Sequence, residues 1–169
     1  MKHINRHIRD KVLSALNVTP VVYLNGPRQA GKSTLVQKLS EKDFPAEYVT
    51  FDSMTQMAAA SNSPETYLKE RNGALIIDEV QLVPEIFRAL KSVVDELRQQ
   101  QSDKLKGRFL LTGSANIMAL PKLSDPLVGR VSVLTLYPLS GAEALNGKGD
   151  FIERLFTGKF LKDSGIHKV

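Results

Sequence analysis

The feature that most constrains the fold is the stretch 21–35, which reads VVYLNGPRQAGKSTL. An apolar, strand-like run comes first, then the pattern G-x-x-x-x-G-K-S, then the beginning of a helix, which is the context in which a P-loop occurs. Glycines in such a loop let backbone N–H groups approach phosphate oxygens, and the N-terminus of the following helix adds further donors. The stretch therefore predicts a phosphate-binding loop between a strand and a helix.

The sequence assigns phosphate contacts to nine consecutive residues, which are Gly26, Pro27, Arg28, Gln29, Ala30, Gly31, Lys32, Ser33 and Thr34. Lys32 would reach the β- and γ-phosphates of a nucleotide, and the Ser33 hydroxyl would ligate Mg²⁺. The alternative interpretation is a glycine-flanked surface turn, which the strand before it and the helix after it disfavour.

A second landmark is the run Ala74-Leu75-Ile76-Ile77-Asp78-Glu79. Four apolar residues followed by two acids are typical of a buried parallel strand that ends at a polar edge. After a P-loop this pattern predicts a Walker B strand, in which Asp78 would hold Mg²⁺ and Glu79 would orient a water against the γ-phosphate. Taken alone, the same run would be a strand end that meets solvent. Gln81 is a further candidate sensor of phosphate or substrate.

Polar residues also end the strand expected over 108–114. Because ligands bind at the carboxyl ends of parallel strands, Thr112 and Ser114 are candidates to contact the attacking water or the γ-phosphate. The alternative for Ser114 is a cap on a helix beginning at Ala115. Asp52, at the end of another expected strand, could bind water near Mg²⁺ or, with Ser53, cap the next helix.

Arg130 precedes the last expected strand, 131–136. An arginine in this place can act as a finger that contacts the γ-phosphate of a neighbouring subunit in a homo-oligomer. The alternative is a surface arginine that pairs with an acid.

The remaining pattern predicts an alternation of helices and strands. The N-terminal segment 3–16 has apolar residues at helical spacing, and this helix either walls an adenine pocket or only packs on the core. Further helices are expected after the P-loop to about residue 41, over 54–62, from Ser63 to Asn72, from Pro84 to about 101, and over 151–160; a further strand is expected over 46–51.

Composition limits the classes of function. The formal net charge is +5, but Lys and Arg are scattered, which indicates a mildly basic solvated surface more than a nucleic-acid-binding arm. There are no cysteines, so disulfides and thiolate metal sites are excluded, and a cytoplasmic location is expected. No apolar run approaches the about 18 residues of a membrane helix, and no signal peptide is recognisable.

Together these motifs resemble the AAA+-type ATPases of prokaryotes that carry a poorly understood C-terminal domain. The resemblance rests on the segments 26–33, 76–81, 111–116, 127–130 and 136–140. It implies a RecA-like α/β core, with a five-stranded parallel sheet in the order 5-1-4-3-2 flanked by helices, and ATP and Mg²⁺ as cofactors. It also implies Walker A at Lys32 and Ser33, Walker B at Asp78 and Glu79, and catalytic roles for Lys32, Glu79, a sensor Thr112 and a finger Arg130.

The same resemblance suggests an organisation into three parts. Residues 1–20 form a helix that packs on the core, residues 21–145 form the ATPase domain, and residues 146–169 begin a C-terminal region that members of the family continue further.

Four functions fit the sequence to different degrees. Mg-dependent ATP hydrolysis acting on an unidentified protein or nucleic-acid partner leads. The alternatives are a nucleotide-binding switch or remnant without turnover, a small-molecule kinase, and a DNA-binding module. The paired Asp78-Glu79 favours hydrolysis over a kinase, no recognisable DNA-binding motif is present, and the lack of an N-K-x-D motif favours ATP over GTP.

Overall fold

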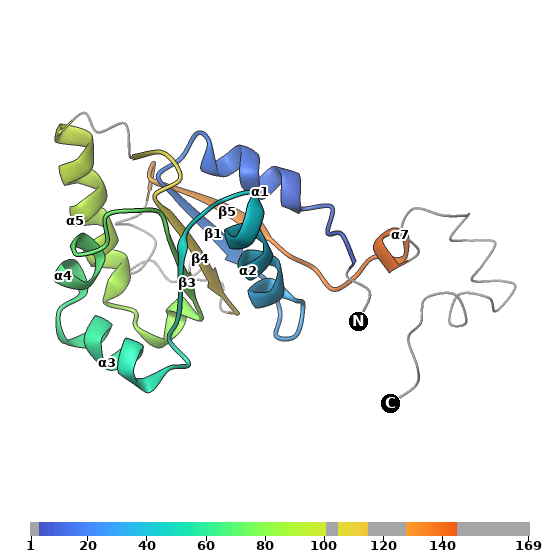
Figure 1. Ribbon diagram of the computed structural model, residues 1–169, viewed down its shortest axis with the longest axis horizontal. Helices are drawn as coiled ribbons and strands as arrows, with labels where there is room; N and C mark the ends of the chain where they lie inside the picture. Colours follow the sequence, from blue (N-terminus) through green and yellow to red (C-terminus); the bar gives the residue numbers. More distant parts are fainter. Residues whose placement is uncertain (1–3, 101–104, 115–127, 145–169) are drawn as a thin grey trace, which may run out of the picture.

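A five-stranded parallel sheet forms the centre of the molecule (Figure 1). The computed structural model describes residues 4–100, 105–114 and 128–144. The strands lie in the order β2-β3-β4-β1-β5, which confirms the order expected from the sequence. Their bounds are Val21–Asn25 for β1, Glu47–Thr50 for β2, Leu75–Asp78 for β3, Phe109–Gly113 for β4 and Val131–Thr135 for β5.

Helices cover both faces of this sheet. One face carries α1 and α2, and the other carries α3, α4 and α5 (Figure 1). A 3₁₀ turn, η1, follows β3, and a short helix, α7, follows β5. The bounds are Arg9–Leu16 for α1, Lys32–Lys42 for α2, Met54–Asn62 for α3, Pro64–Lys69 for α4, Val80–Leu82 for η1, Ile86–Gln99 for α5 and Gly141–Ala144 for α7.

The alternation of side chains along the central strands explains the two-sided core. In β1, Val21 and Tyr23 pack toward α4 and α5, whereas Val22 and Leu24 pack toward α1 and α2. Because β1 lies between β4 and β5, residues on both of its faces are withdrawn from water, and these four side chains are fully buried. This is why the strand is a continuous apolar run in the sequence.

The parallel arrangement brings the carboxyl ends of all five strands to one edge of the sheet. Asn25 of β1 pairs in register with Gly113 of β4 and Thr135 of β5, and Thr50 of β2 pairs with Asp78 of β3. The loop after β1, the acids Asp78 and Glu79 at the end of β3 and the polar tip of β4 therefore meet at this carboxyl edge.

Some expected boundaries differ from the structure. The N-terminal helix begins at Arg9 instead of residue 3, because the Arg6 side chain is held by groups outside the helix. The helix expected from Pro84 begins at Ile86. The helix expected over 151–160, the segment 115–127 and the cap at Ala115 lie outside the described residues. Within the described part of the chain, no helix is both long and apolar enough to cross a bilayer.

Candidate functional site

The loop 26–31 joins β1 to α2 at the carboxyl edge, and two glycines fix its path. Gly26 has φ of +158°, and a Cβ there would lie 2.2 Å from the backbone oxygen of Leu136, so this position has no room for a side chain. Gly31 has φ of +90° and precedes α2, whose N-terminus has no side-chain cap. The first N–H groups of α2 are consequently left available for an anion.

Lys32 is the first residue of α2 and is 4% exposed. Its Nζ donates hydrogen bonds of 3.0 Å to the backbone oxygens of Gly26 and Pro27. No ion pair joins Lys32 to a carboxylate among the residues that the structure describes. The loop therefore curls around a buried cation whose charge is not neutralised.

A cavity of about 280 Å³ opens beside this cation. Its lining residues come from the loop, from the first turn of α2 and from the end of β3: Gln29, Gly31, Lys32, Ser33, Thr34 and Glu79. Pro27 and Arg28 are exposed at the tip of the loop, and Ala30 is buried. Five of the nine predicted phosphate-contacting residues thus line the same cavity as Glu79, whereas Gly26, Pro27, Arg28 and Ala30 do not.

Asp78 ends β3 and is 3% exposed. The Tyr48 hydroxyl donates to its Oδ2 at 2.8 Å, and the Thr112 hydroxyl donates to its Oδ1. Burial and the hydrogen bond to Asp78 raise the pKa of Tyr48 to about 12, so the phenol remains a donor at neutral pH. Thr112 also accepts the Glu79 N–H at 3.3 Å, which connects the tip of β4 to both acids.

Glu79 is held in an unusual conformation. Its φ of +54° lies in the left-handed region, which is rare for a residue with a Cβ and is often found at functional sites. The Gln81 amide donates to its carboxylate and lies 3.4 Å from the Ser114 hydroxyl. The structure therefore places Gln81 and Ser114 beside Glu79.

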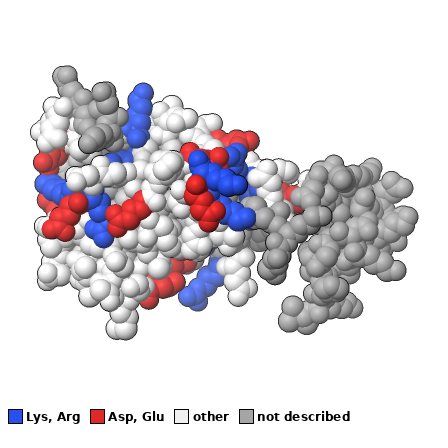
Figure 2. Space-filling model, in the orientation of Figure 1, with Lys and Arg blue, Asp and Glu red and all other residues white. Residues whose placement is uncertain are grey.

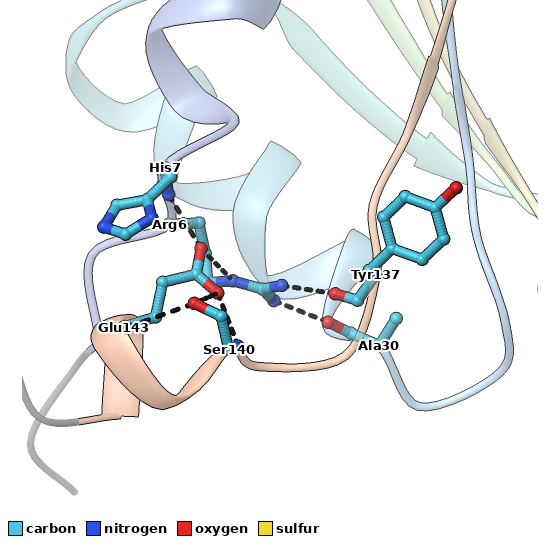
Figure 3. Close-up of polar contacts among 6 residues, drawn as sticks. All are labelled: Arg6, His7, Ala30, Tyr137, Ser140 and Glu143. Atoms are coloured by element: carbon cyan, nitrogen blue, oxygen red, sulfur yellow. Dashed lines mark hydrogen bonds and ion pairs between the residues drawn. The ribbon is translucent and has the colours of Figure 1, made fainter. Parts of the chain in front are cut away.

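A second polar cluster, missed by the sequence analysis, fixes the outer side of the loop (Figure 3). Arg6 donates from Nη1 to the Ala30 oxygen at 2.7 Å, from Nη2 to the Tyr137 oxygen, and from Nε to Glu143 at 3.2 Å. The N–H groups of His7 and Ser140 donate to the same carboxylate at 2.8 and 2.9 Å. This Arg6–Glu143 cluster ties the N-terminal segment, the loop and the segment after β5 together.

The electrostatics of Glu143 follow from these contacts. Burial acts to raise its pKa, but the two backbone hydrogen bonds and the Arg6 guanidinium outweigh burial and hold the pKa at about 2. The sequence did contain one signal, because Ser140-x-x-Glu143 has the spacing of a capping box, and Ser140 and Glu143 make both reciprocal bonds of that motif. Arg6 had no comparable local signal.

Two other predicted residues lie away from the cavity. Arg130 precedes β5 and is therefore at the amino edge, where it forms a two-pronged pair with Asp95 at 2.7 and 2.9 Å. Within one chain the structure thus shows the alternative for Arg130, a pair with an acid. Asp52 is exposed. Ser53 occupies the N-terminal cap position of α3, as the capping interpretation expected, but no side chain makes a capping hydrogen bond to that helix.

The described side chains at the site do not form a complete metal-binding cluster. Across residues 4–100, 105–114 and 128–144, no three His, Asp or Glu side chains form a cluster that would hold a metal ion by themselves. A Mg²⁺ ion bound together with phosphates needs only one or two protein carboxylates, and Asp78 is a buried carboxylate directly before the cavity-lining Glu79.

Solved structures share this fold. The Walker-type ATPase PABY2304 of Pyrococcus abyssi aligns over 93% of this chain and 59% of its own, with a TM-score of 0.55 and 15% identity. Domain III of the replication initiation protein DnaA of Thermotoga maritima aligns over 90% of this chain and 68% of its own, with a TM-score of 0.56 and 15% identity. At this identity the likeness concerns the fold, which is that of the P-loop NTPases.

Comparison of sequences identifies the family of the chain. The chain is 37% identical over 127 residues to the uncharacterised proteins Rv2008c of Mycobacterium tuberculosis and Mb2031c of Mycobacterium bovis. The match covers 75% of this chain but 27% of each relative, so the chain spans about a quarter of their length. Residues 18–145 match the family described as AAA domain. The chain therefore belongs to the AAA domain family.

Proposed function

We propose that this chain binds ATP in the loop 26–34 and hydrolyses it with the help of Mg²⁺. The observation that carries the proposal is the buried Lys32 cation. It is held by two backbone oxygens, has no carboxylate partner in the part of the chain that the structure describes, and lines the same cavity as Glu79. A phosphate chain entering this cavity would neutralise Lys32 and accept hydrogen bonds from the uncapped N-terminus of α2.

The residues near Lys32 fit a magnesium–phosphate complex. Ser33 lines the cavity from the first turn of α2, and Asp78 keeps further lone pairs besides those that accept from Tyr48 and Thr112. In this proposal Ser33 and Asp78 hold Mg²⁺, which would neutralise charge on the β- and γ-phosphates.

Glu79 would orient the attacking water. Glu79 lines the cavity, its backbone N–H donates to the Thr112 hydroxyl, and its carboxylate accepts from the Gln81 amide. Because phosphoryl transfer depends mainly on position and electrostatics, a carboxylate fixed in this way suits hydrolysis better than simple nucleotide retention.

The base would lie in a cavity of about 430 Å³ on the outer side of the Arg6–Glu143 cluster. The N-terminal segment and the segment after β5 line it together, with apolar surface from Ile8, Leu136 and Pro138. Such a space suits an adenine ring, and it supports the interpretation of the N-terminal segment as a wall of the base pocket.

The proposals on oligomerisation and partners concern Arg130 and the charged surface. Arg130 would reach phosphate only in a neighbouring copy of the chain, since it lies at the amino edge of its own sheet. Figure 2 shows Lys and Arg interspersed with Asp and Glu on the visible described surface. That distribution does not favour a DNA-binding groove on this face. The proposed partner is a protein or a nucleic acid.

Nucleotide binding is tested by the melting temperature of the chain with Mg-ATP, Mg-ADP and Mg-GTP. A ligand at about 100 times its dissociation constant adds about 2.7 kcal/mol to the free energy of unfolding. We expect ATP and ADP to raise the melting temperature of the native chain but not of Lys32→Ala. Lys42→Ala is the matched control, because it removes an exposed lysine from the other end of α2. A response in Lys32→Ala equal to the native one would refute the site.

Hydrolysis is tested by phosphate release. Glu79→Gln should bind ATP as the native chain does and release phosphate at least about 100-fold more slowly, in the range of a lost general base. Glu70→Gln, at an exposed position, is the matched control. Binding without release in the native chain would instead establish the non-hydrolysing switch.

A further inference from the structure

A separate cavity of about 370 Å³ lies at the amino edge of the sheet, at the opposite ends of the strands from the loop 26–34. Its polar walls come from the end of α4, the segment before β3, the second half of α5 and the residue before β4. The residues are Lys69, Arg71, Asn72, Glu96, Gln100 and Arg108. Figure 1 shows α4 and α5 side by side on this side of the sheet. None of these residues takes part in the proposed ATP site.

Arg108 is the unusual member of this set. It directly precedes β4 and is 7% exposed. Its Nη2 donates to the backbone oxygen of Arg71, and its guanidinium lies 5.0 Å from the centre of the Phe109 ring. Its Nη1 is buried and has no hydrogen-bond partner, and no carboxylate within the described ranges lies at ion-pair distance from Arg108.

A buried guanidinium without a counter-ion is a costly arrangement, because the charge has lost its water and gained no opposite charge in exchange. Burial lowers the pKa of Arg108, but an arginine remains charged under all ordinary conditions. Among the described residues Arg108 thus lacks a counter-ion, and the cavity that it lines is the space in which an anion could lie.

The neighbouring charges already neutralise one another. Lys69 pairs with Glu96 at 2.6 Å, and Arg71 pairs with Glu47 at 3.1 Å. Arg71 is further held by the Tyr67 ring, 3.7 Å from its guanidinium carbon. Of the described basic residues that line this cavity, only Arg108 has no carboxylate partner.

We propose that the cavity at the amino edge binds a small carboxylate anion, with Arg108 as its counter-ion. A carboxylate carries the single charge that is missing, and its two oxygens match the fork of a guanidinium. Glu96, which also lines the cavity, repels a doubly charged phosphate more than a carboxylate. The volume lies within the range of small-molecule sites.

The test titrates the full chain with sodium acetate against sodium chloride at constant ionic strength, without nucleotide. In NMR spectra, ¹³C-labelled acetate should give nuclear Overhauser effects from its methyl group to the methyl groups of Val93 and Leu97, which also line the cavity. The effects should saturate with a midpoint on the order of 10 mM, as expected for so small a ligand. Absence of these effects, or a dependence that never saturates, overturns the proposal.

Substitutions test whether the response to acetate arises at Arg108. Acetate should raise the melting temperature of the native chain and of Arg88→Met by the same few degrees, and should leave that of Arg108→Met unchanged. Arg88 is an exposed arginine on the same helix as Glu96, so its replacement changes the charge equally. Equal responses in all three chains would assign the effect to general salt. The last comparison uses Lys32→Ala, in which the phosphate site of the loop is removed. If inorganic phosphate raises the melting temperature of this variant to a plateau and acetate does not, the carboxylate assignment is wrong.

Discussion

Two arginines, one at each edge of the sheet, are almost equally buried but differ in their partners. Arg6 at the carboxyl edge is 9% exposed, and Arg108 at the amino edge is 7% exposed. Arg6 has a carboxylate, Glu143, at 3.2 Å and donates to two backbone oxygens. Arg108 donates to one backbone oxygen, and its Nη1 has no partner among the residues that the structure describes.

The difference shows that burial of a charge does not by itself identify a ligand site. The Arg6–Glu143 cluster is complete, so the fold explains why Arg6 is there: it positions the loop through Ala30 and joins three segments of the chain. The described surroundings of Arg108 lack a counter-ion, and an anion in the cavity would supply it. Lys32 is intermediate, because its hydrogen bonds are made but its charge is not neutralised.

The largest expected effect separates the two arginines by substitution. Arg6→Met should lower the free energy of unfolding by about 3–5 kcal/mol, because it leaves Glu143 buried without its cation. Arg108→Met should be neutral or stabilising, because a buried charge without a partner is replaced by an apolar chain of similar length. Urea unfolding in buffers free of carboxylate and phosphate measures both. Similar losses in the two variants would contradict the comparison.

A second contrast concerns glycines at the two edges. Gly26→Ala should cost about 3 kcal/mol, because the new Cβ would lie 2.2 Å from a backbone oxygen and the conformation itself disfavours a side chain. Gly73→Ala, before β3 at the amino edge, meets nothing within 4 Å and should change stability by less than about 0.5 kcal/mol. Urea unfolding and ATP binding should both be impaired in Gly26→Ala alone. An unaffected Gly26→Ala would mean that the loop is less closely enclosed by the end of β5 than described.

Acid should weaken the carboxyl edge through Glu143. The pKa of Glu143 is about 2 in the folded chain and near 4.5 when unfolded, so its contribution is complete above about pH 4.5 and is lost as the pH falls toward 2. After allowance for solvent screening, we expect about 2 kcal/mol from this group. Glu143→Gln should remove that part of the pH dependence, whereas Arg108→Met should retain it. The measurement is urea unfolding between pH 5 and the acid limit of folding, and a slope unaltered in Glu143→Gln would contradict the assignment.

The sequence predicted the carboxyl edge well because its signals are local. A strand is followed by its polar tip within a few residues, and parallel pairing then brings Lys32, Asp78, Glu79 and Thr112 to one edge. The loop and the position of Glu79 beside Lys32 follow from such short patterns, whereas the order of the strands was implied by the family resemblance.

The two buried arginines could not be predicted in the same way. Arg6 and Glu143 are 137 residues apart, and Arg6 lies in a segment whose apolar spacing indicated a helix. Arg108 was expected only as the first residue of a strand. Its lack of a counter-ion depends on Glu47 and Glu96 being taken by Arg71 and Lys69, which is a matter of tertiary packing. Neither the Arg6–Glu143 contact nor the lack of a counter-ion at Arg108 produces a periodic pattern or a motif spacing in the sequence.

The smallest expected effect on stability concerns Arg130, the amino-edge arginine that does have an acid. Its pair with Asp95 is partly exposed, so Asp95→Asn and Arg130→Ala should each cost at most about 1 kcal/mol in urea unfolding. If Arg130 also contacts the γ-phosphate of a neighbouring copy, Arg130→Ala should slow phosphate release far more than Asp95→Asn, and the native rate per chain should rise with protein concentration. Equal, minor changes in both variants, with a rate independent of concentration, would confine Arg130 to its pair with Asp95. The amino edge would then contain one arginine with a structural partner and one, Arg108, whose partner is a ligand.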